Sequence, residues 1–329
     1  MNTEFLKDKA ILVTGGTGSF GKNFIKFLLE NSEARKIIVF SRDELKQFKM
    51  QKGLKDDRLR FFLGDVRDLQ RLQRAFRGVD VVIHAAALKQ VPTLEYNPFE
   101  AIKTNVLGSQ NVIEAAIDQG VERVVLISTD KAAQPVNLYG ATKLCAEKLF
   151  VSGNSYTSGK TKFSCVRYGN VLGSRGSIVE AIIKNKEAGK LQITDLDMTR
   201  FWITLPQAFN LVMFALENME GGEIFIPKIP SMKLVDLFDA LAPVAEREII
   251  GIRPGEKLHE ALLTVEEARH SVELEKYFVI LPEFIEMEKF KKYIDQSCGE
   301  LESNFKFHSD SNKEWITKEE LIELVKDLI

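Results

Sequence analysis

The sequence is poor in the features that mark secreted, metal-binding and membrane proteins. Its three cysteines are Cys145, Cys165 and Cys298, an odd number without the spacing of a zinc site or a disulfide framework. The four histidines also lack metal-ligand spacing, so we expect no bound metal. No apolar run approaches the length that spans a bilayer, and no cleavable leader is recognisable before residues 7–9. These absences predict a protein of the reducing cytoplasm.

Charge and length set further limits. The 45 basic and 47 acidic side chains give a formal net charge of -2, which provides no general attraction to nucleic acid or to an anionic membrane. A length of 329 residues with 45% hydrophobic content is enough for one large domain or two smaller ones. The composition therefore predicts a globular protein in which any anion-binding site is local.

Short β-branched runs alternate with amphipathic stretches through the first half of the chain. The segments that we expect to be strands are 10–14, 36–41, 59–63, 79–84, 123–129 and 163–168. Because these strands are apolar throughout, the alternation predicts a doubly wound α/β fold, a parallel sheet covered by helices on both faces. A helix is expected over 99–120, between a preceding Asn97-Pro98 and a closing Gly120.

The alternation loosens in the second half of the chain. We place the first domain at residues 1–171 and a smaller C-terminal lobe at 172–329, with the two interleaved. Segments such as 201–218 are candidates for the lobe. Thr317 and Glu320 form a capping-box pattern, which predicts an amphipathic helix at the end of the chain.

Glycines follow the first predicted strand at a spacing typical of dinucleotide binding. They lie between that strand and a helical pattern, where glycines permit a tight turn that holds a pyrophosphate at the helix N-terminus. A triphosphate-binding loop is rejected because Asn23 stands where such a loop needs Ser or Thr. The loop residues expected at the cofactor are Gly15, Thr17, Gly18, Ser19, Phe20 and Gly21.

The end of the second predicted strand indicates which dinucleotide binds. Ser41 and Arg42 stand where an acid would bind the ribose of NAD, and an arginine fork suits the extra phosphate of NADP. Asp43 and Glu44 follow at once, so NAD stays open beside the favoured NADP. The remaining cofactor contacts are expected from Lys46, Asp65, Val66, Ala85, Lys89, Tyr139 and Lys143.

A cluster of reactive side chains follows the fifth predicted strand. Tyr139 and Lys143 share one face if their segment is a helix, and an ammonium beside a phenol favours the phenolate, which can act as a general base. Thr129, Asp130 and Lys131 come shortly before this pair. Adjacent strand positions face opposite ways, so Asp130 and Lys131 reach one ligand only if the backbone turns after Thr129.

Further motifs occur in order along the chain. They are Ser41-Arg42-Asp43-Glu44, Ser128-Thr-Asp-Lys-Ala132, Arg167-Tyr-Gly-Asn170, Met198-Thr-Arg-Phe-Trp202 and Arg253-Pro-Gly-Glu-Lys257. With the glycine loop and the Tyr139/Lys143 pair, they resemble the extended short-chain dehydrogenases/reductases. More narrowly, the chain is similar to the inverting UDP-N-acetylglucosamine 4,6-dehydratases that begin pseudaminic acid synthesis. Retaining relatives carry Asp-Glu where this chain has Asp130-Lys131, and this difference predicts inversion at carbon 5.

The resemblance implies a closed redox cycle on bound NADP, with a hydride taken from carbon 4 of the sugar and returned to carbon 6. It implies that Tyr139, assisted by Lys143 and Thr129, takes the proton of the 4-hydroxyl. Lys131 is then the base at carbon 5 and Asp130 the acid for the departing 6-hydroxyl, which requires a neutral amine and a protonated carboxyl. The UDP-sugar contacts are expected from Lys89, Asn170, Arg175, Thr194, Arg200, Arg253 and Glu256.

Other functions stay open. A UDP-sugar 4-epimerase, or a dehydratase/epimerase of capsule or O-antigen synthesis, would use the same Tyr139 and Lys143, whereas the Asp130-Lys131 pair favours elimination. A dinucleotide sensor without turnover is a third alternative, although such a protein would not need Tyr139 and Lys143. The resemblance also implies a homo-oligomer, a dimer or a hexamer, and use of the product in flagellin glycosylation.

Overall fold

The computed structural model describes residues 2–174, 176–185, 190–283 and 287–326. Strands of one large sheet are β1 (Ala10–Thr14), β2 (Lys36–Ser41), β3 (Leu59–Leu63), β4 (Val81–His84), β5 (Arg123–Ile127), β6 (Lys162–Val166), β10 (Ile224–Pro227), β14 (Ser271–Glu273) and β15 (Tyr277–Ile280). In the described residues this sheet has the order β14-β15-β10-β6-β5-β4-β1-β2-β3. The strands from β10 to β3 run parallel, whereas β15 is antiparallel to both of its neighbours.

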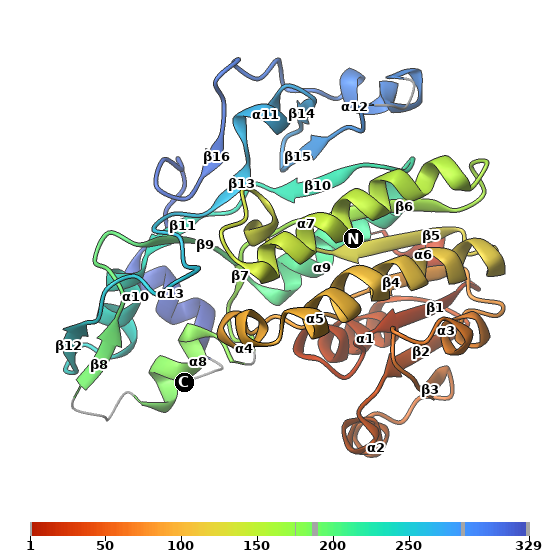
Figure 1. Cartoon of the computed structure of the whole chain (residues 1–329), viewed down its shortest axis with the longest axis horizontal. Coiled ribbons are helices and arrows are strands. Elements are labelled where there is room, and N and C mark those ends of the chain that lie inside the picture. Colours follow the sequence, from red (N-terminus) through yellow and green to blue (C-terminus); the bar gives the residue numbers. More distant parts are fainter. Residues whose placement is uncertain (1, 175, 186–189, 284–286, 327–329) are drawn as a thin grey trace.

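Helices cover both faces of the sheet (Figure 1). On one face lie α1 (Ser19–Asn31) and α9 (Leu205–Asn218), joined where the ring of Phe209 meets those of Phe20, Phe24 and Phe27. The other face carries α3 (Leu69–Ala75), α6 (Gly108–Gln119) and α7 (Leu138–Gly153), and α2 (Glu44–Gly53) lies beside β2 and β3. The doubly wound α/β fold predicted from the sequence is confirmed.

The helix expected over 99–120 is present but irregular. After α4 (Val91–Tyr96) it begins as α5 (Pro98–Ala101), widens into a π-helical segment (Ile102–Leu107) and continues as α6. Gly120 ends it with a φ of 68°, in the left-handed region that favours glycine. A π-helical turn re-aims the side chains that it carries, and here it supplies a residue that supports the cleft described below.

A smaller lobe has its own hydrophobic core, built around Trp202, Met232, Leu237 and Leu321. Its elements are β7 (Asn170–Val171), α8 (Ile178–Lys184), β8 (Lys190–Ile193), β9 (Thr199–Ile203), β11 (Ser231–Lys233), α10 (Leu234–Leu241), β12 (Glu246–Ile249) and α13 (Lys318–Val325). The chain enters the lobe after β6 and returns to the large sheet for α9 and β10 and again for β14 and β15. The assignment of 201–218 to the lobe is wrong for α9, because the apolar face of this helix packs against α1 and the large sheet.

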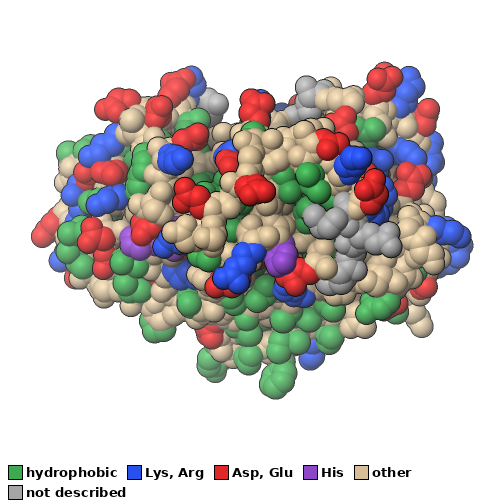
Figure 2. All heavy atoms as spheres, turned by 90° about the horizontal axis from the view of Figure 1, so that it is seen from above, with side chains coloured by type: hydrophobic (Ala, Val, Ile, Leu, Met, Phe, Trp, Pro, Cys, Tyr) green, Lys and Arg blue, Asp and Glu red, His purple; other side chains and the backbone are tan. Residues whose placement is uncertain are grey.

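The remaining elements are short. They are β13 (Ala261–Leu263), α11 (Val265–Ala268), α12 (Lys291–Asp295) and β16 (Phe307–His308), with short 3-10 turns at Glu4–Leu6, Asp130–Ala132, Asn154–Tyr156 and Met287–Phe290. At the start of α13, Thr317 and Glu320 form the predicted capping box. None of the helices in the described ranges is long and apolar enough to cross a membrane. Acidic and basic side chains are interspersed over the face shown in Figure 2, as the small net charge leads one to expect.

Candidate active site

A cleft of about 1300 Å³ opens along the carboxyl ends of the parallel strands and is lined by residues of both the large sheet and the smaller lobe. The lining residues at or just beyond the ends of β1 to β6 are Gly15, Arg42, Gly64, Ala85, Ser128 and Tyr168. Ligands of doubly wound sheets bind at this edge, because the loops that follow the strands converge there. The strand order therefore brings together segments that lie far apart in the sequence.

The glycine loop after β1 fits a pyrophosphate. Gly15 has a φ of 64°, and a Cβ there would lie 2.9 Å from the backbone of Ala85. A Cβ at Gly21 would lie 2.6 Å from the carbonyl oxygen of Gly15, so neither position tolerates a side chain. Gly18 stands at the N-cap of α1 without a side-chain cap, which leaves N–H groups of the first turn for an anion. The loop therefore suits a dinucleotide.

All of the residues predicted to contact the cofactor line this one cleft. They are Gly15, Thr17, Gly18, Ser19, Phe20, Gly21, Ser41, Arg42, Lys46, Asp65, Val66, Ala85, Lys89, Tyr139 and Lys143.

Of the charged residues after β2, Asp43 caps a helix and Arg42 lines the cleft. The carboxylate of Asp43 accepts the backbone N–H of Lys46 at 2.9 Å, as the cap of α2, and pairs with the ammonium of Lys46 at 2.6 Å. The Arg42 guanidinium is half-exposed at the cleft and lies 3.7 Å from the Asp65 carboxylate. Asp43 is thus engaged on its own helix, while Arg42 keeps donors that an anion can reach.

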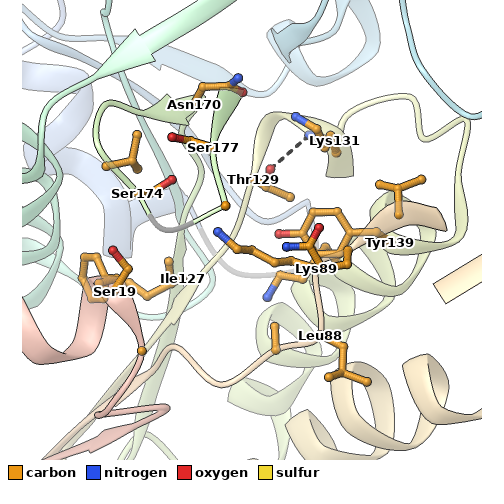
Figure 3. A pocket seen from close by; sticks show the side chains of 18 of the residues that line it. Ser19, Leu88, Lys89, Ile127, Thr129, Lys131, Tyr139, Asn170, Ser174 and Ser177 are labelled. Carbon is orange, nitrogen blue, oxygen red and sulfur yellow. Dashed lines mark hydrogen bonds between the residues drawn. The ribbon is translucent and has the colours of Figure 1, made fainter. Parts of the chain in front are cut away.

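The reactive segment after β5 turns as the sequence argument required. β5 ends at Ile127, and Asp130–Ala132 form one 3-10 turn. The hydroxyl of Thr129 accepts the N–H of Lys131, drawn as the dashed line in Figure 3, and donates to the carboxylate of Asp130 at 2.9 Å. Thr129 and Lys131 line the cleft, but Asp130 is fully buried behind them. Asp130 therefore connects to the cleft through its two neighbours.

Lys131 lies between two carboxylates. Its Nζ is 3.0 Å from Asp130 Oδ1 and 3.4 Å from Glu260 Oε1. Burial raises the pKa of Asp130, in the direction that an acid catalyst needs. Burial also opposes the charge on Lys131, but the two carboxylates outweigh it and raise the pKa of this lysine. The predicted neutral amine is therefore wrong for this structure, because Lys131 keeps its proton while both carboxylates are beside it.

Tyr139 and Lys143 face the cleft from the first turns of α7. This end of α7 is fixed by Asn137, whose side chain accepts the N–H of Gly140 at 2.8 Å. Burial raises the pKa of Tyr139 to about 12 despite the opposing charge of Lys131, and burial lowers the pKa of Lys143 to about 8. The predicted phenolate is thus wrong for this structure, because burial penalises the anion more than the nearby cations stabilise it.

Lys89 extends into the same pocket as Tyr139 and Lys131 (Figure 3). Its loop is held by Asn105 of the π-helical segment, which accepts the N–H of Leu88 at 2.8 Å and donates to the carbonyl of Leu88 at 2.9 Å. Burial in the cleft, together with the charge of Lys131, lowers the pKa of Lys89. The π-helical segment therefore fixes the loop that carries Lys89.

Six of the seven residues predicted for the UDP-sugar line the cleft. Arg200 is buried, and its guanidinium donates to the carbonyls of Thr199, Leu258 and Lys257, so much of its donor capacity serves the lobe itself. Arg253 is more exposed and lies 4.0 Å from the carboxylate of Glu256. Lining residues from this set are Lys89, Asn170, Thr194, Arg200, Arg253 and Glu256. Arg175 lies outside the described residues.

Two site residues carry no clear signal in the sequence. Glu260 comes far later than Lys131 in the chain, and only the docking of the segment before β13 against the 3-10 turn brings them together. Asn105 lies inside an amphipathic helical pattern, where an asparagine resembles any polar surface position. His84, at the end of β4, is a buried core residue whose ring nitrogens are bonded to the hydroxyls of Thr14 and Ser109.

Comparison with known proteins gives one family and consistent relatives. The family model described as Polysaccharide biosynthesis protein matches residues 11–282. A UDP-N-acetylglucosamine 4,6-dehydratase (inverting) of Campylobacter jejuni subsp. jejuni serotype O:2 is 51% identical over 96% of this chain and 97% of its own. A UDP-glucose 4-epimerase of Rickettsia rickettsii is 43% identical over 83% of each chain.

Solved structures agree with the fold. Pen from Bacillus thuringiensis is 40% identical, with a TM-score of 0.89 over 98% of this chain and 99% of that one. DesIV, a dTDP-glucose 4,6-dehydratase from Streptomyces venezuelae solved with NAD and TYD bound, is 26% identical. Its TM-score is 0.68 over 76% of this chain and 86% of that one. The extended dehydrogenase/reductase resemblance is thereby confirmed.

Proposed function

The chain belongs to the polysaccharide biosynthesis protein family, and we propose that it is a hydro-lyase that removes water from UDP-N-acetylglucosamine. The observation that carries the proposal is the Asp130–Lys131 pair beside Tyr139. Elimination needs an acid and a base at carbons 5 and 6 in addition to the base at carbon 4, and this pair supplies them. We extend the proposal to NADP as cofactor, to inversion at carbon 5, and to the first step of pseudaminic acid synthesis.

A bound nicotinamide dinucleotide supplies reversible hydride acceptance, which oxidises carbon 4 and later reduces carbon 6. Tyr139 takes the proton of the 4-hydroxyl as carbon 4 becomes a ketone. With a pKa of about 12, Tyr139 needs additional positive charge in the filled cleft to act near neutral pH. Lys143 and Lys89 line the same cleft, and we assign this role to their ammonium groups.

The ketone acidifies the hydrogen at carbon 5, and elimination follows. A proton moves from Lys131 Nζ to Asp130 Oδ1 across 3.0 Å, which converts the ion pair into a neutral amine and a carboxylic acid. Lys131 then takes the proton from carbon 5. The proton of Asp130 reaches the departing 6-hydroxyl through the Thr129 hydroxyl, which lies 2.9 Å from Asp130 Oδ1. Water leaves, and the two side chains return to the ion pair that the structure shows.

A new proton completes the product at carbon 5 after carbon 6 has been reduced. Inversion requires this proton to arrive on the face opposite to the one from which Lys131 removed the first. Four proton transfers balance: Tyr139 and Lys131 each accept one, while the leaving hydroxyl and carbon 5 each receive one. Since the last proton comes from solvent, the product is expected to carry a solvent hydrogen at carbon 5.

The NADP preference rests on the geometry after β2. Asp43 caps α2 and pairs with Lys46, so the acid that would favour NAD is already engaged. Arg42 presents its guanidinium at the cleft, where a 2'-phosphate would lie. NAD is the alternative, because DesIV was solved with NAD bound.

A homo-oligomer is supported by apolar side chains on the outer helices. Tyr96 of α4 is 87% exposed and Phe99 of α5 is 74% exposed, and Leu107 of the π-helical segment is also exposed. Large apolar groups that lie together at a surface favour contact with another chain. We propose that these helices contribute to a dimer, the smallest of the expected assemblies.

Proton NMR of UDP-N-acetylglucosamine incubated with the protein in deuterated water tests the proposal. We expect a new methyl signal at carbon 6, deuterium at carbon 5, and the coupling pattern of the L-arabino ketone. An unchanged D-configuration would overturn inversion, and the absence of any reaction would overturn the proposed activity.

A 4-epimerase is the second candidate, favoured by Tyr139 and Lys143 and by the Rickettsia rickettsii likeness. Lys131→Met separates the two functions. A dehydratase loses the methyl-forming reaction in this variant, whereas an epimerase keeps forming the 4-epimer because its chemistry needs no base at carbon 5. Tyr139→Phe is the matched control, since it is expected to abolish either activity.

A further inference from the structure

Glu260 is a buried charge that the proposed mechanism does not use. Its backbone is fixed by Ser309, whose hydroxyl accepts the N–H of Glu260 at 2.9 Å and whose N–H donates to the carbonyl of Glu260 at 2.8 Å. Its carboxylate stands between two lysines, with Oε1 3.4 Å from Lys131 Nζ and Oε2 3.3 Å from Lys257 Nζ. Lys257 is itself held by the carbonyl of Ala133, at 2.7 Å. The order Lys257–Glu260–Lys131–Asp130 is thus a line of alternating charges, of which Glu260 and Lys131 line the cleft.

We propose that Glu260 is a positioning residue that sets how tightly the Asp130–Lys131 pair holds its proton, with Lys257 as the opposing charge. This inference rests on the proposed elimination, in which that pair must convert from an ion pair into an amine and an acid. Glu260 does not touch the sugar in this account. It acts through Lys131, whose ammonium it holds beside Asp130.

The two carboxylates that flank Lys131 are not equivalent. Each has one buried oxygen to which no described atom forms a hydrogen bond, Asp130 Oδ2 and Glu260 Oε2, but the ammonium of Lys257 lies 3.3 Å from Glu260 Oε2. Burial opposes charge on Glu260 as well, but Lys131, Arg200 and Lys257 outweigh burial and lower the pKa of Glu260. The proton that leaves Lys131 therefore moves to Asp130, while Glu260 stays ionised and supplies a fixed negative field.

The sign of that field is defined by the geometry. A negative charge at Glu260 stabilises the ammonium of Lys131 and destabilises the carboxylate of Asp130, so it raises the proton affinity of the pair as a whole. Lys257 partly cancels this field. Among the residues that the structure describes, the other titratable and charged groups that face the pair are Arg200, Tyr139 and Lys89.

Removal of the negative charge of Glu260 and removal of the positive charge of Lys257 are expected to move the pH dependence in opposite directions. The assay follows kcat/KM for dehydration against pH, with UDP-N-acetylglucosamine that carries hydrogen or deuterium at carbon 5, because a primary isotope effect shows that removal of this hydrogen by Lys131 is the step being followed. Glu260→Gln is expected to shift this pH profile to lower pH by about one unit or more, because one negative charge is lost. Lys257→Gln is expected to shift it to higher pH, because one positive charge is lost.

Two further variants separate electrostatics from folding. Glu260→Asp keeps the charge on a shorter stem, so its profile is expected to stay close to that of the unmodified protein even if the rate falls. Glu273→Gln, which removes the charge from the partly buried Lys228–Glu273 pair at 2.7 Å outside the cleft, is expected to leave the profile unchanged. A merely structural role for Glu260 would lower rates without moving the profiles in opposite directions.

The outcomes are distinguishable from failure of the proposed function. If the unmodified protein does not dehydrate UDP-N-acetylglucosamine, the proposed function fails and Glu260 loses its assigned role with it. If the unmodified protein does so, but the Glu260→Gln and Lys257→Gln profiles coincide with it or move together, the role of Glu260 is overturned alone. Should Glu260→Gln not fold, Lys257→Gln and Glu260→Asp still decide the matter, because an unmoved Lys257→Gln profile contradicts the inference.

Discussion

Replacing Glu147 of α7 with alanine is expected to destabilise the protein by about 3–5 kcal/mol, the usual cost of removing one partner from a buried ion pair. Arg167, just beyond β6, has no exposed surface, and its Nε and Nη2 donate to Glu147 at 3.1 and 2.6 Å. It also donates to Glu267 at 2.9 and 2.8 Å and to the carbonyl of Leu262 at 3.0 Å. All of its N–H donors are thus engaged, and Glu147→Ala leaves two of these bonds without an acceptor in a place that water cannot reach.

Equilibrium unfolding in urea, followed by tryptophan fluorescence and circular dichroism, measures this cost. Lys26→Ala is the control, because the Lys26–Glu30 pair on α1 is exposed and its loss is expected to cost less than about 0.5 kcal/mol. Exchanging all three charged partners, in Glu147→Leu with Arg167→Met and Glu267→Gln, is expected to recover much of the loss, since Glu267 also pairs with Arg167 and no unpaired charge then remains. The reasoning is refuted if Glu147→Ala costs no more than the exposed control.

Three further substitutions test the cleft and the core. Gly15→Ala places a Cβ 2.9 Å from the backbone of Ala85 at a φ of 64°, so it is expected to destabilise the protein by about 1–2 kcal/mol through backbone strain alone. It is also expected to weaken cofactor binding, measured by fluorescence titration. Gly53→Ala is the control, because Gly53 has open space around it and neither effect is expected there. Burial and Lys143 lower the pKa of His84 to about 3 from its ordinary 6.5, so protonation favours the unfolded chain, and stability should fall by about 1.4 kcal/mol per pH unit as the pH drops from 6.5 towards 3. In His84→Gln, the urea midpoint is expected to fall less between neutral and mildly acidic pH than in the unmodified protein. Arg42→Ala is expected to weaken NADP binding about tenfold or more while leaving NAD binding nearly unchanged, which competitive titration of the two cofactors decides; equal losses would remove Arg42 from the phosphate site.

The first three strands along the chain were predictable to the residue, because each is a short and mostly apolar run. The fifth was predicted too long, since Ser128 and Thr129 look like strand residues but lie where the backbone leaves the sheet. The misplaced α9 has a related cause. Its apolar stripe shows that one face is buried, but periodicity does not say whether the large sheet or the lobe covers that face.

The cleft was largely predictable because the carboxyl ends of parallel strands converge whatever the intervening sequence. The protonation states of the residues in the cleft could not be predicted from the sequence. Those of Tyr139 and Lys131 depend on burial, and that of Lys131 also depends on Glu260, which comes from a distant part of the chain. The four-residue spacing of Tyr139 and Lys143 indicates that both lie on one helix face. It does not indicate how deeply they are buried, and burial sets their protonation states.

The position of β10 between β6 and β15 has a consequence for how the protein is made. A ribosome that has released residues 1–171 has delivered β1 to β6, but the partner of β6 is still to be synthesised. During that interval β6, whose residues are largely buried in the finished protein, is an open edge that can pair with any other extended chain. Expression of residues 1–171 alone is therefore expected to give aggregates and not a smaller dinucleotide-binding protein, and sheet closure must wait until the chain has travelled through the lobe and back.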